Sequence, residues 1–297
     1  MAKYITPAVT PLTEAHELDE KGLPVLYEHL IRGGVDGILI LGSIGEFFAL
    51  SLSTKQALIE RAVQIVDHRV PLLVGTGGTV FEETVSLSRY ALEKGADAVV
   101  IVPPYYFPLT GPSLEAYYDK LCEAIPGKIY LYNFPDRTGY EIPVETVTRL
   151  AQKHANLMGI KDTISGMDHT RELIKAVKPV RPDFEIYSGF DDNFAHNVLS
   201  GGDGCIGGLS NLVPELCHDW VCAVTDGDWK KTQECQQKIN RLMSVYAVGT
   251  PFVPFIKCAM TIRGIAVGST ATIPLPEATA EQYAALQDIL RNENLIQ

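Results

Sequence analysis

A lysine stands at the end of a short apolar segment, where its charge would be costly. The segment Leu157-Met158-Gly159-Ile160-Lys161-Asp162 is typical of a buried strand, but its last two residues are charged. Burying an ammonium group among apolar residues is unfavourable unless the site uses it. A desolvated lysine gives up its proton more readily, and the free amine attacks carbonyl carbons. The alternative is a strand-end lysine that points into water, so the surrounding sequence has to decide.

Three other groups would complete the chemistry of a 2-oxo acid, with which a lysine amine forms a Schiff base that acts as an electron sink. Tyr132 ends a second apolar segment, and its phenol could move protons. The turn Gly42-Ser43-Ile44-Gly45 offers backbone N–H groups that suit a carboxylate. Arg137 could bind a second anionic or polyhydroxy portion through paired donors.

Each of these residues also has a purely structural interpretation. Tyr132 could be an aromatic core residue, the glycines could serve only the turn, and Arg137 could form a surface or interface ion pair. Tyr105 and Tyr106 could pack at a subunit contact, where tyrosine is enriched. No role is assigned to the histidines, which are scattered and expected on helix faces or in solvent: His16, His29, His68, His154, His169, His196 and His218.

Segments with strand and helix patterns alternate along most of the chain. The expected strands are 4–9, 36–41, 70–74, 97–102, 128–132, 157–162, 184–187 and 204–207, and helices follow each, among them 54–67 with Ser53 as its N-cap. Eight such units in a row predict a (β/α)8 TIM barrel. A doubly wound open sheet usually has fewer strands and a glycine fingerprint after its first strand. That turn here is Thr10-Pro11-Leu12, so the barrel is favoured.

The expected barrel brings the chemically interesting residues together, because barrel enzymes place catalytic groups at the carboxyl ends of their strands. The residues at these ends are Ser43 with its turn, Tyr105-Tyr106, Tyr132 through Arg137, Lys161, and Gly189. We therefore expect them around one mouth of the barrel. Lys128, in contrast, begins a strand and is expected at the opposite, structural end.

The last part of the chain does not continue the alternation. Residues 228–246, 252–263 and 280–291 have helical patterns, and no Gly/Ser-rich linker precedes them. We expect a catalytic barrel over residues 1–225 and a helical extension, packed on the barrel, over residues 226–297.

Composition and charge narrow the possible functions. The chain has 297 residues, which is ordinary for a barrel of one domain, and a net charge of −11, which argues against nucleic acid as a partner. No apolar run is long enough to span a bilayer, and the N-terminus lacks a signal-peptide pattern. The six cysteines show no C-x-x-C pair or zinc spacing, so we expect buried thiols in a reducing cytoplasm and no metal.

These motifs, in this order, resemble the dihydrodipicolinate synthase / N-acetylneuraminate lyase family of class I, pyruvate-handling aldolases. The resemblance covers nearly the whole chain. Its markers are Gly42-Ser43-Ile44-Gly45-Glu46, Tyr132-Asn133-Phe134-Pro135, Gly159-Ile160-Lys161-Asp162 and Gly201-Gly202-Asp203-Gly204. Within the family, stretches such as Gly189-Phe190-Asp191-Asp192 are most similar to bacterial 2-keto-3-deoxygluconate aldolases.

The resemblance implies a role for each residue of the site. Lys161 would form the Schiff base with pyruvate or a pyruvate-derived 2-oxo acid, and Tyr132 would shuttle protons with help from Ser43. Ser43 and the backbone of Ile44 would hold the carboxylate, and Gly45 of the same turn is expected among the substrate-binding residues. The resemblance also implies a homotetramer built as a dimer of dimers, without metal or organic cofactor. The remaining implied residues are Tyr106, which would reach across a dimer contact, and Gly189 and Ile206, which would line the pocket beside the imine.

The substrate is less clear than the family. We expect reversible cleavage of a 2-keto-3-deoxy sugar acid to pyruvate and an aldehyde. Ile44 replaces a hydroxyl residue expected in the synthases, and the lost hydrogen bond to a charged group is worth about 1.5–3 kcal/mol. Arg137, however, matches the arginine that synthases use for aspartate semialdehyde, so dihydrodipicolinate synthase is the alternative. A lyase of other keto acids, a dehydratase and a catalytically silent keto-acid-binding protein also stay open.

Overall fold

The computed structural model describes residues 2–297. Its strands are parallel and follow one another in chain order, β1 to β8, around a closed barrel, with helices between them. The predicted (β/α)8 fold is therefore confirmed. By compactness the chain divides into two units, one of Leu72–Ile206 with the first residues up to Lys3, and the other of Tyr4–Pro71 with Gly207–Gln297.

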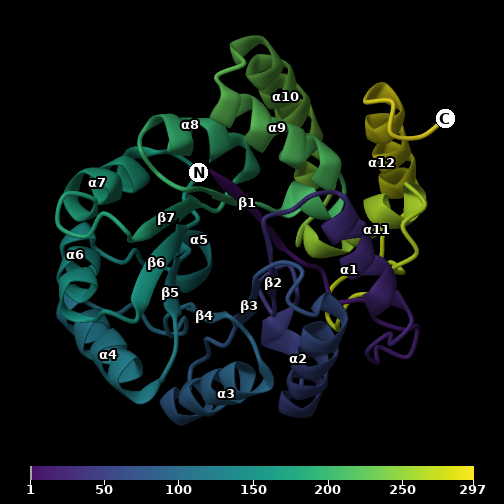
Figure 1. Cartoon of the computed structure of the whole chain (residues 1–297). Coiled ribbons are helices and arrows are strands. Elements are labelled where there is room, and N and C mark those ends of the chain that lie inside the picture. Colours follow the sequence, from purple (N-terminus) through teal and green to yellow (C-terminus); the bar gives the residue numbers. More distant parts are fainter. Residues whose placement is uncertain (1) are drawn as a thin grey trace. The chain divides into compact units, whose positions relative to one another are not determined.

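The first unit carries the strands that end in Tyr132 and Lys161. Its strands are β3 (Leu72–Gly75), β4 (Ala98–Ile101), β5 (Ile129–Asn133), β6 (Leu157–Asp162), β7 (Glu185–Ser188) and β8 (Gly204–Ile206). Its helices are α3 (Phe81–Lys94), α4 (Gly111–Ala124), α5 (Pro135–Thr138), α6 (Val144–Lys153), α7 (Asp168–Val177) and α8 (Phe194–Leu199). Figure 1 shows α4, α6 and α7 outside the strands β5, β6 and β7.

The second unit contains the first two strands and the C-terminal helices. Its elements are β1 (Lys3–Pro7), α1 (Gly22–Arg32), β2 (Gly37–Ile40), α2 (Leu52–Val66), α9 (Pro214–Asp226), α10 (Trp229–Leu242), α11 (Val253–Ile262) and α12 (Ala280–Asn292). The expected C-terminal helices are thus present. Short 3₁₀ turns, Phe47–Ala49, Gly208–Asn211 and Met243–Ala247, complete the unit. The division at residue 225 stays a prediction.

The strands are apolar on both faces because both faces are covered. All four residues of β2, β3 and β4 are buried, and so are all five of β5. Continuous apolar runs of this kind are typical of parallel sheets with helices outside and side chains inside. The same burial explains why the sequence pattern located the strands to within about two residues.

Two details differ from the sequence prediction. Helix α2 is capped by Ser51, whose side chain accepts a hydrogen bond from the Thr54 backbone N–H, and not by Ser53. Ser51 has the extended backbone that a cap requires, whereas Ser53 already lies in the first helical turn. The helix expected after the seventh strand is also divided, since Asp191–Asn193 form a 3₁₀ turn before α8 begins at Phe194.

Most cysteines are buried, as expected: Cys122, Cys205, Cys217, Cys235 and Cys258, whereas Cys222 is exposed. Across residues 2–297, no helix combines the length and the apolar character that crossing a membrane would require.

Candidate active site

Lys161 and Tyr132 lie side by side at the ends of adjacent strands. Strands β5 and β6 pair in parallel, with Tyr132 opposite Lys161 in the register. The Lys161 Nζ lies 4.5 Å from the centroid of the Tyr132 ring. Both residues are only 4% exposed. The structure therefore brings the predicted nucleophile and the predicted proton carrier together, and the alternative of a lysine that points into water is wrong.

An aromatic row extends from this pair toward Arg137. The ring of Phe134 stacks on that of Tyr132, with centroids 5.8 Å apart and planes 26° apart. The Arg137 Cζ lies 5.2 Å from the centroid of the Phe134 ring. Sequence analysis expected Arg137 in the stretch after the strand, and the structure places it on the short helix α5, which begins at Pro135.

Arg137 keeps its guanidinium group exposed. Its Nη1 donates a 3.3 Å hydrogen bond to the carbonyl oxygen of the neighbouring Asp136. Within residues 2–297, no carboxylate lies at ion-pair distance from this side chain. A planar cation held over an aromatic ring retains donors for a ligand anion.

Gly189 allows strand β7 to approach the segment that follows Lys161. A Cβ atom on Gly189 would lie 1.8 Å from Thr163 Oγ1 and 2.8 Å from Thr163 Cα. The Gly189 N–H also donates a 2.8 Å hydrogen bond to the Asp162 carbonyl oxygen. Any side chain would therefore push β7 away from the end of β6. Ile206, which was predicted with Gly189 to line the pocket, is the last residue of β8 and fully buried.

A buried polar network lies directly behind the reactive pair, and sequence analysis missed it. The Asp162 carboxylate accepts hydrogen bonds from Asn133 Nδ2 at 2.7 Å and Thr170 Oγ1 at 2.6 Å, and both its oxygens lie 3.1 Å from His169 Nδ1. His169 was expected on a helix face or in solvent; it is on α7 but only 7% exposed. Two polar residues ending apolar strands, Asn133 and Asp162, were the available signal, because buried polar groups need partners.

The predicted carboxylate-binding turn, Gly42–Gly45, lies in the second unit directly after β2. Backbone N–H groups of Glu46 and Phe47 close it by donating to the carbonyl oxygens of Ser43 and Gly42, at 3.2 and 3.4 Å. Thr10 Oγ1 donates a 2.7 Å hydrogen bond to the Gly45 carbonyl oxygen. A Cβ on Gly45 would lie 3.0 Å from the Ala8 carbonyl oxygen, so a side chain there would force the backbone around the turn to shift by a few tenths of an ångström.

A buried ion pair anchors the end of this turn. Glu46 has a left-handed backbone (φ 59°), and its Oε1 accepts a 2.5 Å hydrogen bond from Lys257 Nζ on α11. Both side chains are fully buried. Lys257 Nζ also donates to the Thr270 carbonyl oxygen, and the Thr272 N–H donates to Glu46 Oε2. Burial lowers the pKa of Lys257 below its usual value, and the Glu46 carboxylate opposes that effect.

Tyr106 lies on the connection between β4 and α4 and is 81% exposed. Its ring contacts that of Phe107, also largely exposed, in an edge-on arrangement with centroids 5.0 Å apart. Aromatic side chains exposed to this extent are common at protein–protein contacts. Its predicted role at a subunit contact stays a prediction.

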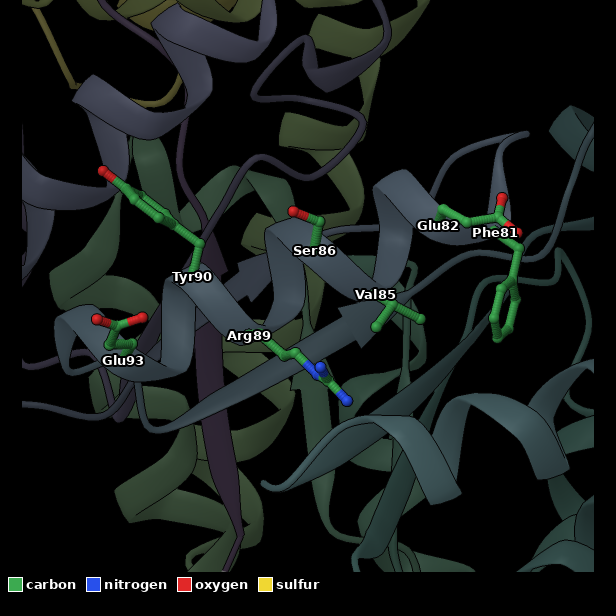
Figure 2. Close-up of a pocket in the computed structure, with 7 residues that line it drawn as sticks. All are labelled: Phe81, Glu82, Val85, Ser86, Arg89, Tyr90 and Glu93. Carbon is green, nitrogen blue, oxygen red and sulfur yellow. The ribbon is translucent and has the colours of Figure 1, made fainter.

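Two surface hollows, one in each unit, are lined by residues other than these. One, of about 500 Å³, lies along α3. Figure 2 shows its lining residues: Phe81, Glu82, Val85, Ser86, Arg89, Tyr90 and Glu93. The other, of about 630 Å³, lies in the second unit between α1, the start of α9 and the segment after α11, and is lined in part by Arg32 and Arg263. Neither includes a predicted site residue. Across residues 2–297, no group of three His, Cys, Asp or Glu side chains is arranged to hold a metal ion.

A parallel barrel with a buried lysine beside a tyrosine at its strand ends matches the class predicted from the sequence, barrel enzymes that form a Schiff base. The sequence model of the Dihydrodipicolinate synthetase family matches residues 1–293, and the chain belongs to this family. It is thus a class I, pyruvate-dependent lyase.

Two relatives match over almost their full length. The chain is 37% identical over 292 residues to the probable 2-dehydro-3-deoxy-D-pentonate aldolase YjhH of Escherichia coli, covering 98% of this chain and 97% of that protein. It is 36% identical to the putative 2-dehydro-3-deoxy-D-gluconate aldolase YagE of the same organism, with 98% and 96% covered.

Solved structures give the same result. The crystal structure of Escherichia coli YagE in complex with pyruvate matches with a TM-score of 0.97 at 35% identity, covering 100% of this chain and 99% of that one. Dihydrodipicolinate synthase from Thermotoga maritima matches with a TM-score of 0.94 at 30% identity, covering 100% and 99%. The family assignment made from the motifs is therefore confirmed.

Proposed function

We propose that this protein cleaves a 2-keto-3-deoxy sugar acid reversibly into pyruvate and an aldehyde. The observation that carries the proposal is the Lys161 amine held over the Tyr132 ring at the ends of β5 and β6, with both residues buried. The relatives named as sugar-acid aldolases support this choice of substrate class.

The proposed mechanism uses the lysine as a nucleophile and the tyrosine as a proton carrier. The Lys161 amine attacks the C2 carbonyl carbon, and loss of water gives an iminium ion. Tyr132 takes the proton of the C4 hydroxyl while the C3–C4 bond breaks. The electron pair of that bond moves toward the iminium nitrogen, which turns the iminium into an enamine, and the aldehyde leaves. Protonation at C3 and addition of water then release pyruvate and restore the amine.

A binding role for the substrate's carboxylate is assigned to the Gly42–Gly45 turn of the second unit. We propose that the Ser43 hydroxyl and the backbone N–H of Ile44 hold it, as the family resemblance implies, with Gly45 of the same turn also in the substrate-binding site. The closed geometry of the turn and its anchor at Glu46 support a rigid binding element. We also propose a homotetramer in which Tyr106 reaches a neighbouring subunit. A cytoplasmic location stays a prediction.

Arg137 favours a second candidate, the condensation of pyruvate with aspartate semialdehyde. Its exposed guanidinium over Phe134 suits the distal carboxylate of that aldehyde. Steady-state rates separate the two reactions. The proposal expects higher kcat/KM for cleavage of 2-keto-3-deoxygluconate or its pentonate analogue than for the condensation. The reverse order would identify a synthase, and pyruvate binding without turnover would identify a silent binding protein.

A further inference from the structure

The polar network behind Lys161 and Tyr132 consists of Asp162, Asn133, His169 and Thr170. Its carboxylate is completely buried, and Asn133 and Thr170 are each 1% exposed. Asn133 is fixed in orientation, because its Oδ1 accepts a 3.0 Å hydrogen bond from the Ile142 N–H while its Nδ2 donates to Asp162. A carboxylate this deeply buried is costly unless hydrogen-bond donors around it stabilise its negative charge.

The surroundings of His169 determine its protonation. Its Nδ1 faces the two Asp162 oxygens, and its Nε2 lies 3.0 Å from the Ile142 carbonyl oxygen. Both partners can only accept hydrogen bonds, so only the doubly protonated imidazolium ring satisfies both contacts. Burial disfavours this charge, yet the hydrogen bond and charge of Asp162, together with Glu141, raise the pKa of His169 above its usual value.

The network is joined to the reactive pair through the strand register. Tyr132 pairs with Lys161, and the next residues, Asn133 and Asp162, pair with each other. Successive side chains of a strand point to opposite faces, so the network connects β5 and β6 on the face opposite the Lys161–Tyr132 pair. His169 and Thr170 connect this network to α7, and the backbone of Ile142 connects it to the segment before α6.

We propose that Asp162, Asn133 and the imidazolium form of His169 are positioning residues that hold Lys161 and Tyr132 in facing register. This inference rests on the roles proposed above for Lys161 and Tyr132. When His169 loses a proton, one ring nitrogen becomes an acceptor facing an acceptor, and a hydrogen bond of the network is lost. The charged groups that face the ring are Asp162 on β6 and Glu141 before α6, and its Nε2 lies 3.7 Å from the Glu141 Oε1.

The test compares His169→Gln with His154→Gln in the full-length protein. His154 is a matched control, because its Nε2 lies 2.6 Å from Asp119 Oδ1, but it precedes β6 at the other end of that strand. Glutamine has donors on a single nitrogen and an acceptor oxygen beside it, so it cannot place a donor at both ring-nitrogen positions of His169, and it does not titrate. Three readouts are needed: kcat for pyruvate release against pH, the titration of each histidine ring by NMR, and borohydride trapping of pyruvate on Lys161.

The proposal predicts that His169 titrates above the ordinary histidine value of about 6.5, and that the wild-type kcat falls at alkaline pH along the same curve. In His169→Gln this alkaline fall disappears, and kcat at neutral pH drops about tenfold to a hundredfold with little change in KM. His154→Gln keeps the wild-type profile. Asp162→Asn, which leaves the shape but removes the charge, should lower kcat and return the His169 titration toward its ordinary value.

A wild-type kcat and pH profile in His169→Gln would overturn the inference, as would a His169 ring that titrates at or below its ordinary value. If the inference is overturned in this way while the variants still trap pyruvate on Lys161, only the positioning role is lost and the proposed function stands. If the wild-type protein itself traps no pyruvate on Lys161, the proposed function fails, and the positioning role fails with it.

Discussion

At the scale of single residues, the site depends on the Lys161–Tyr132 pair. The two parallel strand ends already indicated this pair, since residues that end neighbouring strands meet at one edge of a sheet. The aromatic row from Tyr132 through Phe134 to Arg137 was not predictable, because the side-chain directions depend on the short helix α5. The same holds for His169, whose partner Asp162 is seven residues away on another element.

The tyrosine hydroxyl is expected to matter more than its ring. Tyr132→Phe keeps the stacking with Phe134 and the contact with Lys161, but removes the proposed proton carrier. We expect kcat to fall by about 10²- to 10⁴-fold, while borohydride still traps pyruvate on Lys161. The control is Tyr130→Phe on the same strand, whose hydroxyl bonds Glu185, and which should alter stability more than kcat. Equal losses of kcat in both variants would contradict the role of Tyr132.

Gly189 provides a second residue-level prediction. Alanine there would place its Cβ 2.8 Å from the Thr163 backbone Cα, so β7 or the segment after Lys161 must shift. We expect Gly189→Ala to lower the free energy of unfolding by about 1–3 kcal/mol and to reduce kcat. Gly78→Ala is the control, since its Cβ would meet only Thr84 Oγ1 at 3.7 Å. Denaturant unfolding of both variants measures the difference, and equal stabilities would refute the packing argument.

At the scale of elements, the sequence pattern predicted the strands well because each is an apolar run covered on both faces. It predicted helix starts less well, as Ser51 and Ser53 show, since two adjacent serines offer the same capping group and only the backbone conformation distinguishes them. The anchor of the Gly42–Gly45 turn could not be predicted. Glu46 and Lys257 are separated by 211 positions, and neither residue type is expected in a core.

The Glu46–Lys257 pair is expected to hold the turn in place. Lys257→Met leaves the Glu46 carboxylate buried without its cation, which should destabilise the protein by about 3–5 kcal/mol and weaken pyruvate binding. Lys231→Met is the control, because it removes a solvent-exposed pair with Asp219 and should cost about 0–1 kcal/mol. The double variant Glu46→Gln/Lys257→Met should recover part of the loss. Similar effects of Lys257→Met and Lys231→Met would contradict the anchoring role.

At the scale of the whole molecule, the barrel was predictable from the repeated alternation of elements, whereas the substrate was not. The fold and the family are specified by patterns and motifs that involve many residues along the chain. The aldehyde partner depends on a few side chains, of which Ile44 and Arg137 point to different reactions. Relatives named as sugar-acid aldolases and as synthases share the architecture closely, so the fold cannot separate them.

The stability of the molecule should depend on pH through His169. Because the folded state raises the pKa of this ring, it binds the proton more tightly than the unfolded chain does. The stabilisation is therefore fully present below the unfolded value of about 6.5 and is lost as the pH rises through the folded value. Urea unfolding at several pH values should show this decline in the wild-type protein and a smaller one in His169→Gln. Identical slopes would exclude the effect.

The most direct test of the central claim is the intact mass after incubation with pyruvate and borohydride, followed by peptide mapping. The account predicts one stable adduct per chain, located on Lys161, and no adduct in Lys161→Ala although that variant folds. An adduct on another residue, or none while pyruvate is shown to bind, would contradict Lys161 as the nucleophile and favour a protein that binds keto acids without turning them over.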